Sequence, residues 1–433
     1  MTQLNRHITL LLGILLTLAN GMALDWQKSG AHRWVDLAAA GSGRPGFTLM
    51  NPAYTGVQFT NTLSTLILIS NKNLLNGSGV ALGDYDNDGR CDIYLCRLDG
   101  SNVMYRNLGN WKFEDTTAAT GTACPSQFSS GATFADVDGD RDLDLFVTAM
   151  GQPNRLFRND GNGKFTDITT ASGIGTRFGS SSLALADIDG DGDLDLYVVN
   201  YGAKSVLKDG GKLDIVNVNG QLTVRGPFAS RIKFINSQMF EYGEPDEFFL
   251  NDGTGRFTRL DWGGGRFTTH DGKPLKEPYR DQGLSAIFRD INGDRAPDLF
   301  IANDGFTEDR FWINDGRGNF REISPLAVRQ LSFSAMGVDS PTSTATVTTT
   351  FLLSKCSAEI TAAASRSRAP SRVIRWPPAT SRTSRRAAAI ASTSTVVTAP
   401  LRRLPTFPAW PRRSGLGAVF SLMSTSMVGR TYS

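Results

Sequence analysis

Short apolar segments separated by polar turns recur along residues 79–339. Four of them come directly after an aspartate-rich phrase, and each phrase follows another apolar segment, as at residues 131–135 and 182–186. Runs of this length that are rich in β-branched and aromatic residues and end at turn residues are typical of β-strands. The pattern predicts an all-β chain of repeated strand, polar loop and strand. The apolar segments after the phrases are residues 93–95, 145–147, 196–199 and 299–301.

The four aspartate-rich phrases, here called Asp loops 1 to 4, share one spacing, with side-chain oxygens at positions 1, 3, 5 and 9. Carboxylates this close repel one another unless a hard cation lies among them, and ligands that are all oxygens favour calcium. We expect side-chain oxygens from positions 1, 3, 5 and 9, and a backbone carbonyl from position 7. The sequence therefore predicts structural calcium in each loop. The expected ligands are Asp84, Asp86, Asp88, Arg90 and Asp92 in loop 1; Asp136, Asp138, Asp140, Asp142 and Asp144 in loop 2; Asp187, Asp189, Asp191, Asp193 and Asp195 in loop 3; and Asp290, Asn292, Asp294, Ala296 and Asp298 in loop 4.

Other interpretations of the loops fit less well. An EF-hand begins similarly, but it needs a Glu at position 12 and a helix on each side, and neither follows these phrases. Position 6 favours glycine because the chain turns there with positive φ. Gly89 and Gly192 satisfy this, whereas Arg141 and Arg295 predict strained or weaker loops. Solvated acidic turns without metal are the remaining alternative, which the recurrence of the spacing in register with strands disfavours.

A second marker follows each loop and begins with an asparagine. In three cases it has the form Asn-Asp-Gly with another glycine two residues later, and in all four a phenylalanine closes it. Such glycines supply the positive-φ residues of a tight hairpin, and the phenylalanine is expected to begin the next strand. One repeat therefore contains two hairpins, which form a four-stranded sheet. These marker turns are residues 107–113, 159–165, 251–257 and 314–320.

The spacing of the repeats locates an insertion. The first aspartates of the loops, at positions 84, 136, 187 and 290, are 52, 51 and 103 residues apart. The distance from loop to marker turn is 23, 23, 64 and 24 residues, so the extra length lies inside the third repeat. We therefore expect residues 203–243 to be an insertion and not a further repeat. A four-stranded repeat of about 50 residues is typical of a β-propeller blade.

Several phrases resemble a known family. Residues 76–81 and 177–181, together with the Asp loops, resemble the FG-GAP/VCBS repeat family, whose members fold like the seven-bladed propeller of integrin α chains. Residues 55–61 and 310–316 narrow the resemblance to the cartilage acidic protein-like group, whose full-length members end in an ASPIC/UnbV domain. The resemblance covers about residues 45–339. It implies structural calcium at the matching loop positions and a role in binding or adhesion, with no defined reaction.

The N-terminus predicts export. Arg6 and His7 precede an apolar run over residues 8–18, and small residues continue to Ala23. This is typical of a signal peptide, residues 1–23, and indicates an extracellular, periplasmic or cell-surface protein. The run is short for a membrane span, although a retained signal anchor is the alternative. Residues 24–78 are expected to lead into the propeller at 79–339.

Three cysteines lie in the repeat region. Cys91 and Cys96 are five residues apart on one predicted strand, so they point to opposite faces and a bridge between them is disfavoured. We expect a disulfide between Cys96 and Cys124.

The composition changes abruptly after Asp339. Residues 340–433 hold 13 basic residues and one acidic residue, a net charge of +12, whereas residues 1–339 have a net charge of −9. A disordered, arginine-rich tail of this kind could bind nucleic acid or another polyanion. The tail lacks the interleaved aromatic residues that would support nucleic-acid binding.

The repeat spacing offers another explanation of the tail. A fifth loop is due about 52 residues after Asp290, at Thr342. If one base is lost after Asp339, the shifted codons of residues 340–350 permit an Asp loop with its first position there, and those of residues 420–431 permit another. We interpret residues 340–433 as an out-of-frame translation of further blades, and expect them to be disordered. The product would be an incomplete arc of four in-frame blades, and the intact product would carry at least six loops and an ASPIC/UnbV domain. A genuine disordered extension is the alternative.

Three classes of function remain. The first is a secreted, calcium-binding propeller that binds a protein or polysaccharide through its loops without catalysis. The second is an extracellular hydrolase or lyase on the same fold, although His7, His32 and His270 are the only histidines and no nucleophile elbow, zinc cluster or phosphate loop occurs. The third, a nucleic-acid binder, depends on the tail. The insertion is the candidate specificity surface, through Arg225, Phe228, Arg231 and Phe234.

Overall fold

The computed structural model describes most of residues 48–324 and short stretches on either side. The described residues are 27–29, 32–34, 48–210, 212–305, 307–324, 327, 334–339, 352–355 and 393–396. The predicted signal peptide lies outside them. The chain divides into two compact units, Met1–Asn51 and Pro52–Ser433. In the first unit, β1 (Gln27–Ser29) and β2 (His32–Trp34) form an antiparallel hairpin.

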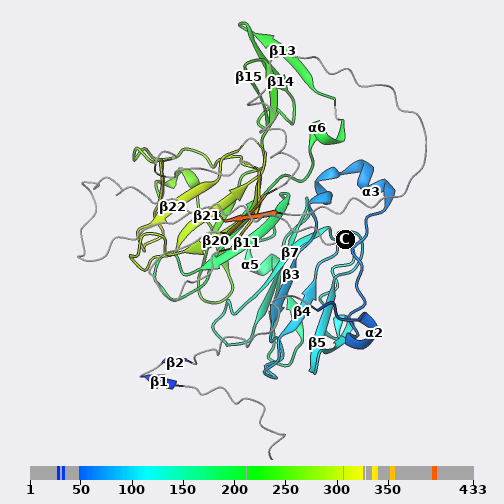
Figure 1. Ribbon diagram of the computed structural model, residues 1–433. Helices are drawn as coiled ribbons and strands as arrows, with labels where there is room; N and C mark the ends of the chain where they lie inside the picture. The colour runs from blue at the N-terminus through cyan, green and yellow to red at the C-terminus, as the bar shows by residue number, and fades with distance from the viewer. Residues whose placement is uncertain are drawn as a thin grey trace, which may run out of the picture. The chain divides into compact units, whose positions relative to one another are not determined.

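The second unit is built from four antiparallel repeat sheets, named repeats 1 to 4 (Figure 1). Each consists of two consecutive hairpins, as the pattern of loops and marker turns predicts. Repeat 1 contains β3 (Val80–Gly83), β4 (Asp92–Leu95), β5 (Val103–Gly109) and β6 (Lys112–Asp115). Repeat 2 contains β7 (Ser129–Ala135), β8 (Asp144–Ala149), β9 (Arg155–Asn159) and β10 (Phe165–Asp167). Repeat 3 contains β11 (Ser180–Ala186), β12 (Asp195–Asn200), β17 (Glu247–Asn251) and β18 (Phe257–Arg259). Repeat 4 contains β20 (Gly283–Arg289), β21 (Asp298–Asn303), β22 (Arg310–Asn314) and β23 (Phe320–Glu322), with β19 (Phe267–Thr268) parallel to β23.

The Asp loops and marker turns lie at fixed points of every repeat. Each Asp loop connects the first strand to the second, and its position-9 aspartate is the first residue of the second strand. That aspartate pairs with the residue just before the loop, as Ala135 does with Asp144 and Ala186 with Asp195. In repeats 2 to 4 the closing phenylalanine of the marker turn begins the fourth strand. The distance in sequence from an Asp loop to its marker turn is therefore the distance between the two hairpin turns of one repeat.

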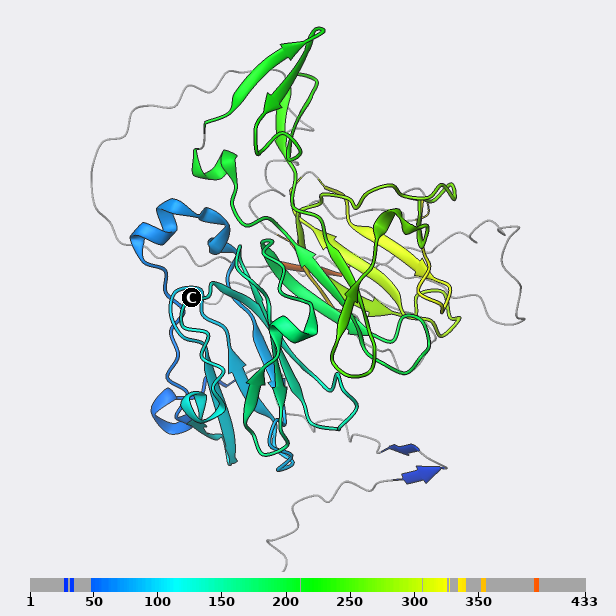
Figure 2. The same cartoon turned by 180° about the vertical axis from the view of Figure 1, so that it is seen from behind.

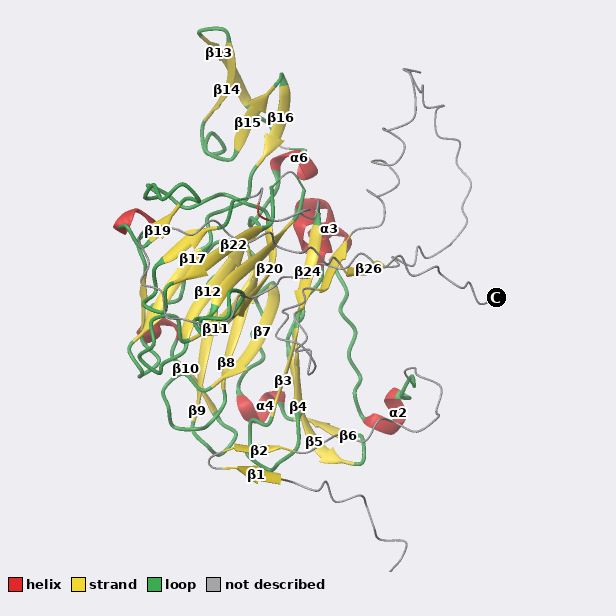
Figure 3. Ribbon diagram, turned by 60° about the vertical axis from the view of Figure 1, so that its left-hand side comes forward, coloured by secondary structure: helices red, strands yellow, loops and turns green. Residues whose placement is uncertain are grey.

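The repeats pack side by side through their first strands. Strands β3, β7, β11 and β20 are neighbours in this order, and Figure 3 shows them as adjacent yellow arrows. Every residue of the second strand is buried in repeats 2, 3 and 4, because each of these sheets has a neighbour on both faces. In β8, Leu145 and Val147 pack with repeat 1, while Phe146 packs with repeat 3. This explains the nearly continuous apolar runs after the Asp loops.

Helical segments are short. They are α2 (Pro52–Thr55), α3 (Thr65–Ser70), η1 (Lys72–Asn76), α4 (Thr117–Thr120), α5 (Thr169–Ser172), α6 (Val206–Asp209) and η2 (Trp262–Gly264). None of the helices in the described part of the chain has the length and apolar character of a membrane span. The segment before repeat 1 is held to repeat 3, since the side-chain amides of Asn71 and Asn73 donate to the carbonyls of Ala203 and Gly202.

The residues between β12 and β17 form two hairpins separate from the sheet of repeat 3. Strands β13 (Asp214–Val218) and β14 (Gln221–Arg225) make the first, and β15 (Ile232–Ile235) and β16 (Gln238–Glu241) the second (Figure 2). Arg225 is exposed, and Phe228 and Phe234 are half-buried. The expectation that Arg231 belongs to the exposed surface is wrong. Its guanidinium is buried because it pairs with Glu241 at 3.2 Å and Glu244 at 3.6 Å.

A last sheet follows repeat 4. Strand β24 (Ala335–Asp339) packs beside β20, pairs with β25 (Leu352–Lys355), and β25 pairs with β26 (Thr393–Val396). The expectation that residues 340–433 are disordered is therefore wrong for β25 and β26, since each pairs with a neighbouring strand and so satisfies backbone N–H and C=O groups. The rest of this stretch lies outside the described residues.

Candidate metal centre

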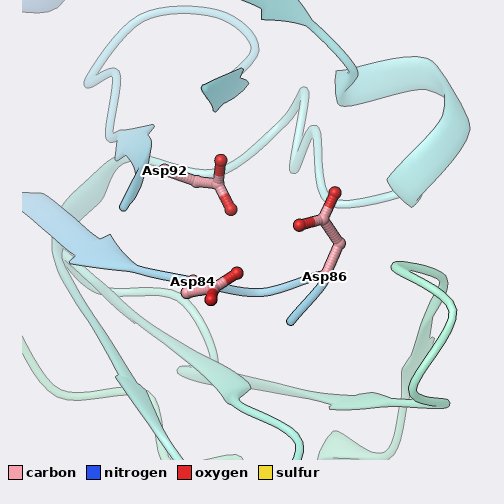
Figure 4. A group of neighbouring side chains, drawn as sticks. All are labelled: Asp84, Asp86 and Asp92. Carbon is pink, nitrogen blue, oxygen red and sulfur yellow. The ribbon is translucent and has the colours of Figure 1, made fainter. Parts of the chain in front are cut away.

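Three Asp loops bring three carboxylates together. In loop 1, Asp84, Asp86 and Asp92 each place an oxygen within 4.8 Å of the others, and Figure 4 shows the three carboxylates turned toward one another. Positions 1, 3 and 9 converge in the same way in loops 2 and 3. Loop 4 has an amide, Asn292, at position 3. Three hard oxygen donors around a common point match the chemistry of a calcium site.

One oxygen of each cluster lacks a protein partner. Oδ1 of the position-3 aspartate is buried in loops 1, 2 and 3, and none of the described residues forms a hydrogen bond with it. The three atoms belong to Asp86, Asp138 and Asp189. An unpartnered buried carboxylate oxygen is costly, so each atom calls for a cation or an ordered water.

Positions 1 and 9 are held by the backbone. The position-1 aspartate accepts hydrogen bonds from loop N–H groups; in loop 2, for example, Gly139 and Arg141 donate to Asp136 at 2.8 and 3.0 Å. The position-9 aspartate accepts one bond on each oxygen, from the N–H of loop position 2 and from the N–H of the marker asparagine. In loop 2 these donors are Val137 at 3.1 Å and Asn159 at 2.8 Å, both to Asp144. Equivalent bonds hold Asp92, Asp195 and Asp298.

Each loop turns twice through the left-handed region. Position 6 has positive φ throughout, including the non-glycine residues Arg141 at 75° and Arg295 at 76°. The prediction of backbone strain at these two residues is consistent with this geometry. Position 4 also has positive φ, from Asn87 at 57° to glycines at 76° and 82° in the other loops. The positive φ at position 4 was not predicted from the sequence, although the glycine at this position in three of the four loops indicates it.

The comparison with known families covers the first three of these loops. A sequence profile described as "FG-GAP-like repeat" matches residues 84–147 and 136–198. Each match begins at position 1 of an Asp loop and ends in the second strand of the next repeat. Residues 84–198 of the chain therefore contain FG-GAP-like repeats.

The chain is similar to cartilage acidic protein 1 from three species. The mouse protein is 29% identical over 132 residues, covering 30% of this chain and 20% of the relative. The Xenopus tropicalis protein is 26% identical over 269 residues, covering 57% of this chain and 37% of the relative, and the human protein is 27% identical over 136 residues, covering 30% and 20%. The chain thus spans well under half the length of these relatives.

Two solved structures that match the chain align with low TM-scores. The crystal structure of BBS1N in complex with ARL6DN, soaked with lead, aligns with a TM-score of 0.26 and 12% identity, covering 63% of this chain and 73% of that one. The same complex soaked with mercury aligns with a TM-score of 0.27 and 11% identity, covering 63% and 72%. Likeness at this level carries no argument about this chain.

The electrostatics of the Asp loops favour a cation. Burial raises the pKa of Asp92 and Asp195 to about 6, that of Asp144 to about 7 and that of Asp298 to about 8. Burial, followed by the charge of Asp140, also raises the pKa of Asp138. Charged carboxylates are thus disfavoured in these loops without a counter-charge, which a bound divalent ion would supply.

The residues at positions 5 and 7 do not belong to the clusters that the carboxylates of positions 1, 3 and 9 form in loops 1 to 3. In loop 2 the N–H of Asp142 donates to Asp140 Oδ1 at 2.9 Å, which is a local turn contact. Loop 1 differs because arginines approach its carboxylates. Arg106 Nε lies 2.5 Å from Asp86 Oδ2, and the Arg90 guanidinium contacts Asp88. These guanidinium groups supply part of the counter-charge in loop 1.

The prediction that Cys91 and Cys96 share one strand is wrong, because β4 begins after Cys91 and ends before Cys96. Cys91 is exposed and Cys96 is buried. Cys96 and Cys124 pack in one core cluster but are free thiols, so the expected disulfide between them is not formed. Burial raises the pKa of Cys124 to about 11, so this thiol stays protonated and unreactive at neutral pH.

The described side chains include no buried histidine that could serve as a catalytic acid or base. His270 is exposed between repeats 3 and 4, and its carbonyl accepts a hydrogen bond from Arg321. His32 is described only as part of β2, and His7 lies outside the described residues.

Proposed function

We propose that this chain is a secreted, calcium-binding β-propeller repeat protein that acts as a binding or adhesion module without catalysis. The observation that carries the calcium proposal is the buried, unpartnered Oδ1 of the position-3 aspartate, repeated in three loops beside two further carboxylates. The proposed ligands are the side chains of positions 1, 3, 5 and 9 and the carbonyl of position 7. Calcium would neutralise the clustered charge and fix the connection between two strands.

The propeller proposal rests on how the repeats pack. Each repeat is a four-stranded meander whose apolar faces are covered by its neighbours, which is the construction of propeller blades. The first strands lie side by side, as they do around a propeller axis. We propose four blades in residues 79–339, with the hairpins of residues 203–243 as an insertion in the third.

The binding role is proposed from the surface that differs between repeats. The insertion hairpins expose apolar side chains, including Ile215, Leu222 and Ile235, and interrupt the regular repeat. A protein or polysaccharide is the proposed partner, and export is proposed from the N-terminal sequence. The relatives carry the word cartilage in their name, which agrees with an extracellular setting.

We also propose that residues 340–433 are translated out of frame. In repeats 1 to 4 the residue just before the loop pairs with loop position 9, as Arg289 does with Asp298. Strand β24 pairs Asp339 with Leu352. In the repeats, the two residue numbers of the pair that closes the loop differ by nine, and the first loop position follows the smaller number. Counting inward from the Asp339–Leu352 pair, one residue on each side at a time, gives 342 as the number of the first loop position. The repeat spacing gives the same number. Threonine stands at position 342 in place of aspartate.

A hydrolase or lyase activity is the second candidate because of one pocket. It has a volume of about 230 Å³ and is lined by Asp246, Glu247, Arg259 and Trp262, among others. Burial raises the pKa of Asp246 to about 8, as in a general acid. Its oxygens already accept hydrogen bonds from Tyr197 at 2.5 Å and from the backbone of Asn200 at 2.6 Å, which favours a structural role.

Calcium titration of the full chain tests the main proposal. Thermal unfolding is followed in chelator, in calcium and in equal concentrations of magnesium. Calcium at 100 times its Kd stabilises the fold by about 2.7 kcal/mol for each independent site, and magnesium by much less because the loops offer too few rigid octahedral positions. Equal melting temperatures in the three conditions would contradict the calcium proposal.

A further inference from the structure

The marker asparagines connect each Asp loop to the loop before it. Their side-chain amides cross the boundary between repeats and donate to the backbone carbonyl at position 2 of the preceding loop. These bonds run from Asn159 to Tyr85 at 2.7 Å, from Asn251 to Val137 at 2.8 Å and from Asn314 to Ile188 at 2.8 Å. All six residues are buried.

The bonds join into one continuous network. Val137 donates its N–H to Asp144, at position 9 of its own loop, and its carbonyl accepts from the Asn251 side chain. The N–H of Asn251 in turn donates to Asp195, at position 9 of loop 3. The same order repeats across loops 1 and 2 and across loops 3 and 4. Four buried carboxylates are thus linked through backbone and amide groups.

The glycines of the marker turn hold it against both loops. A Cβ on Gly253 would lie 2.6 Å from Asp193 Oδ2 in loop 3, and one on Gly255 would lie 3.4 Å from Val137 Cγ2 in loop 2. A Cβ at Gly253 would clash with Asp193, whereas the distance at Gly255 is an ordinary van der Waals contact, and positive φ favours glycine at both positions. This marker turn therefore packs against both loop 2 and loop 3, so a displacement of one loop would also displace the turn that contacts the other.

We propose that Asn159, Asn251 and Asn314 are positioning residues for the metal loop of the preceding repeat, and that they couple calcium binding between neighbouring loops. This role rests on the proposed calcium function. Each asparagine fixes position 2 of the earlier loop, which lies between the position-1 and position-3 ligands. Calcium in one loop therefore favours the geometry that its neighbour needs.

Two crossed variants test the direction of this effect. Two backgrounds of the full chain are made by replacing the position-1 and position-5 aspartates with asparagine in three loops, which leaves either loop 2 or loop 3 intact. Asn251→Ala and Asn314→Ala are introduced into each, and calcium affinity is measured by isothermal titration. Both variants keep the backbone N–H that donates to their own loop.

Asn251→Ala is expected to weaken calcium binding about fivefold in the loop 2 background, with less than a twofold change in the loop 3 background, since one buried hydrogen bond is lost. Asn314→Ala is expected to weaken calcium binding about fivefold in the loop 3 background and less than twofold in the loop 2 background, because the Asn314 amide donates to the Ile188 carbonyl of loop 3. A general loss of repeat stability would instead make Asn251→Ala weaken loop 3, which belongs to its own repeat. That pattern, or no effect in either background, would overturn the positioning role.

Asn107→Ala is the matched control. The amide of Asn107 donates to the carbonyl of Cys91 in its own loop at 2.8 Å and to no other loop among the described residues, so it should leave both backgrounds unchanged. Native-state hydrogen exchange without metal provides a second readout, in which Asn251→Ala speeds exchange of the Val137 N–H but not of the Ile188 N–H. If neither background binds calcium, the calcium function and the positioning role both fail. Binding that Asn251→Ala does not weaken overturns the positioning role alone.

Discussion

At the scale of the residue, the position-3 aspartates carry the metal proposal. Replacing Asp138 with asparagine keeps the shape of the side chain but removes the charge that faces the cluster. We expect Asp138→Asn to lose roughly one site's share of the calcium stabilisation, about 2.7 kcal/mol at 100 times Kd, and to change stability in chelator much less. Denaturant unfolding with and without calcium measures both quantities.

Asp160→Asn is the control for this substitution. Asp160 belongs to the same repeat and is exposed, and its only hydrogen-bond donors among the described residues are in its own marker turn. It should leave the calcium stabilisation unchanged. An equal loss in both variants would mean that overall acidity, and not the cluster, attracts the ion.

The two arginines at position 6 store backbone strain. A non-glycine residue in the left-handed region costs about 1 kcal/mol, so Arg141→Gly and Arg295→Gly should each raise the free energy of unfolding by about that amount. Gly192→Ala is the reciprocal control, because a Cβ there meets no atom within 4 Å and the expected loss comes from φ alone. Unfolding in guanidinium measures all three variants. No gain at both arginines would show that the loop relaxes the strain.

Buried Asp246 predicts a pH dependence of stability. Burial raises the pKa of Asp246 from 3.8 to about 8, with a further contribution from Asp281, while Arg310 and the Tyr197 hydroxyl bond lower it. The folded chain therefore holds a proton that the unfolded chain releases near pH 4. Stability from this group is present below pH 4 and is lost as the pH rises toward 8, at about 1.4 kcal/mol per pH unit at most.

Asp246→Asn should remove that slope, because the amide stays neutral at every pH. The measurement is the free energy of unfolding of wild type minus variant between pH 5 and pH 8. A difference that stays constant across this range would show that Asp246 is charged in the folded chain.

At the scale of the element, the second strands hold neighbouring repeats together. Phe146 on β8 is 1% exposed and packs edge to face with Phe257 of repeat 3, with ring centroids 5.7 Å apart. Phe146→Ala should cost about 3–5 kcal/mol, since it removes apolar burial and leaves a cavity between two sheets. Trp111→Ala is the comparison, because this aromatic residue is 66% exposed and should change stability by less than about 0.5 kcal/mol. Similar losses in both would contradict packing between repeats as the main source of stability.

At the scale of the whole molecule, the reading frame in which residues 340–433 are translated determines whether the protein contains further blades. We expect the nucleotide sequence, restored by one base after the codon for Asp339, to encode an Asp loop beginning at residue 342. The restored protein should melt at a higher temperature and aggregate less, because additional blades cover the exposed edge of the last sheet. Sequencing and a melting curve of the restored chain test this. A shifted frame without aspartate-rich loops would show that the tail is genuine.

The sequence by itself determined the local units. Loop spacing, marker turns and apolar runs are periodic within about 50 residues, so they predicted the strands, the hairpins and a ligand set that includes positions 1, 3, 5 and 9. The structure brings positions 1, 3 and 9 of that set together in loops 1 to 3. It could not determine the contacts between repeats. Asn251 and Val137 are 114 residues apart, and the marker asparagine looks like a turn residue until two sheets are packed together. The burial of Arg231 and the free state of the Cys96 and Cys124 thiols are likewise decided by tertiary structure, because burial and pairing depend on which distant surfaces meet.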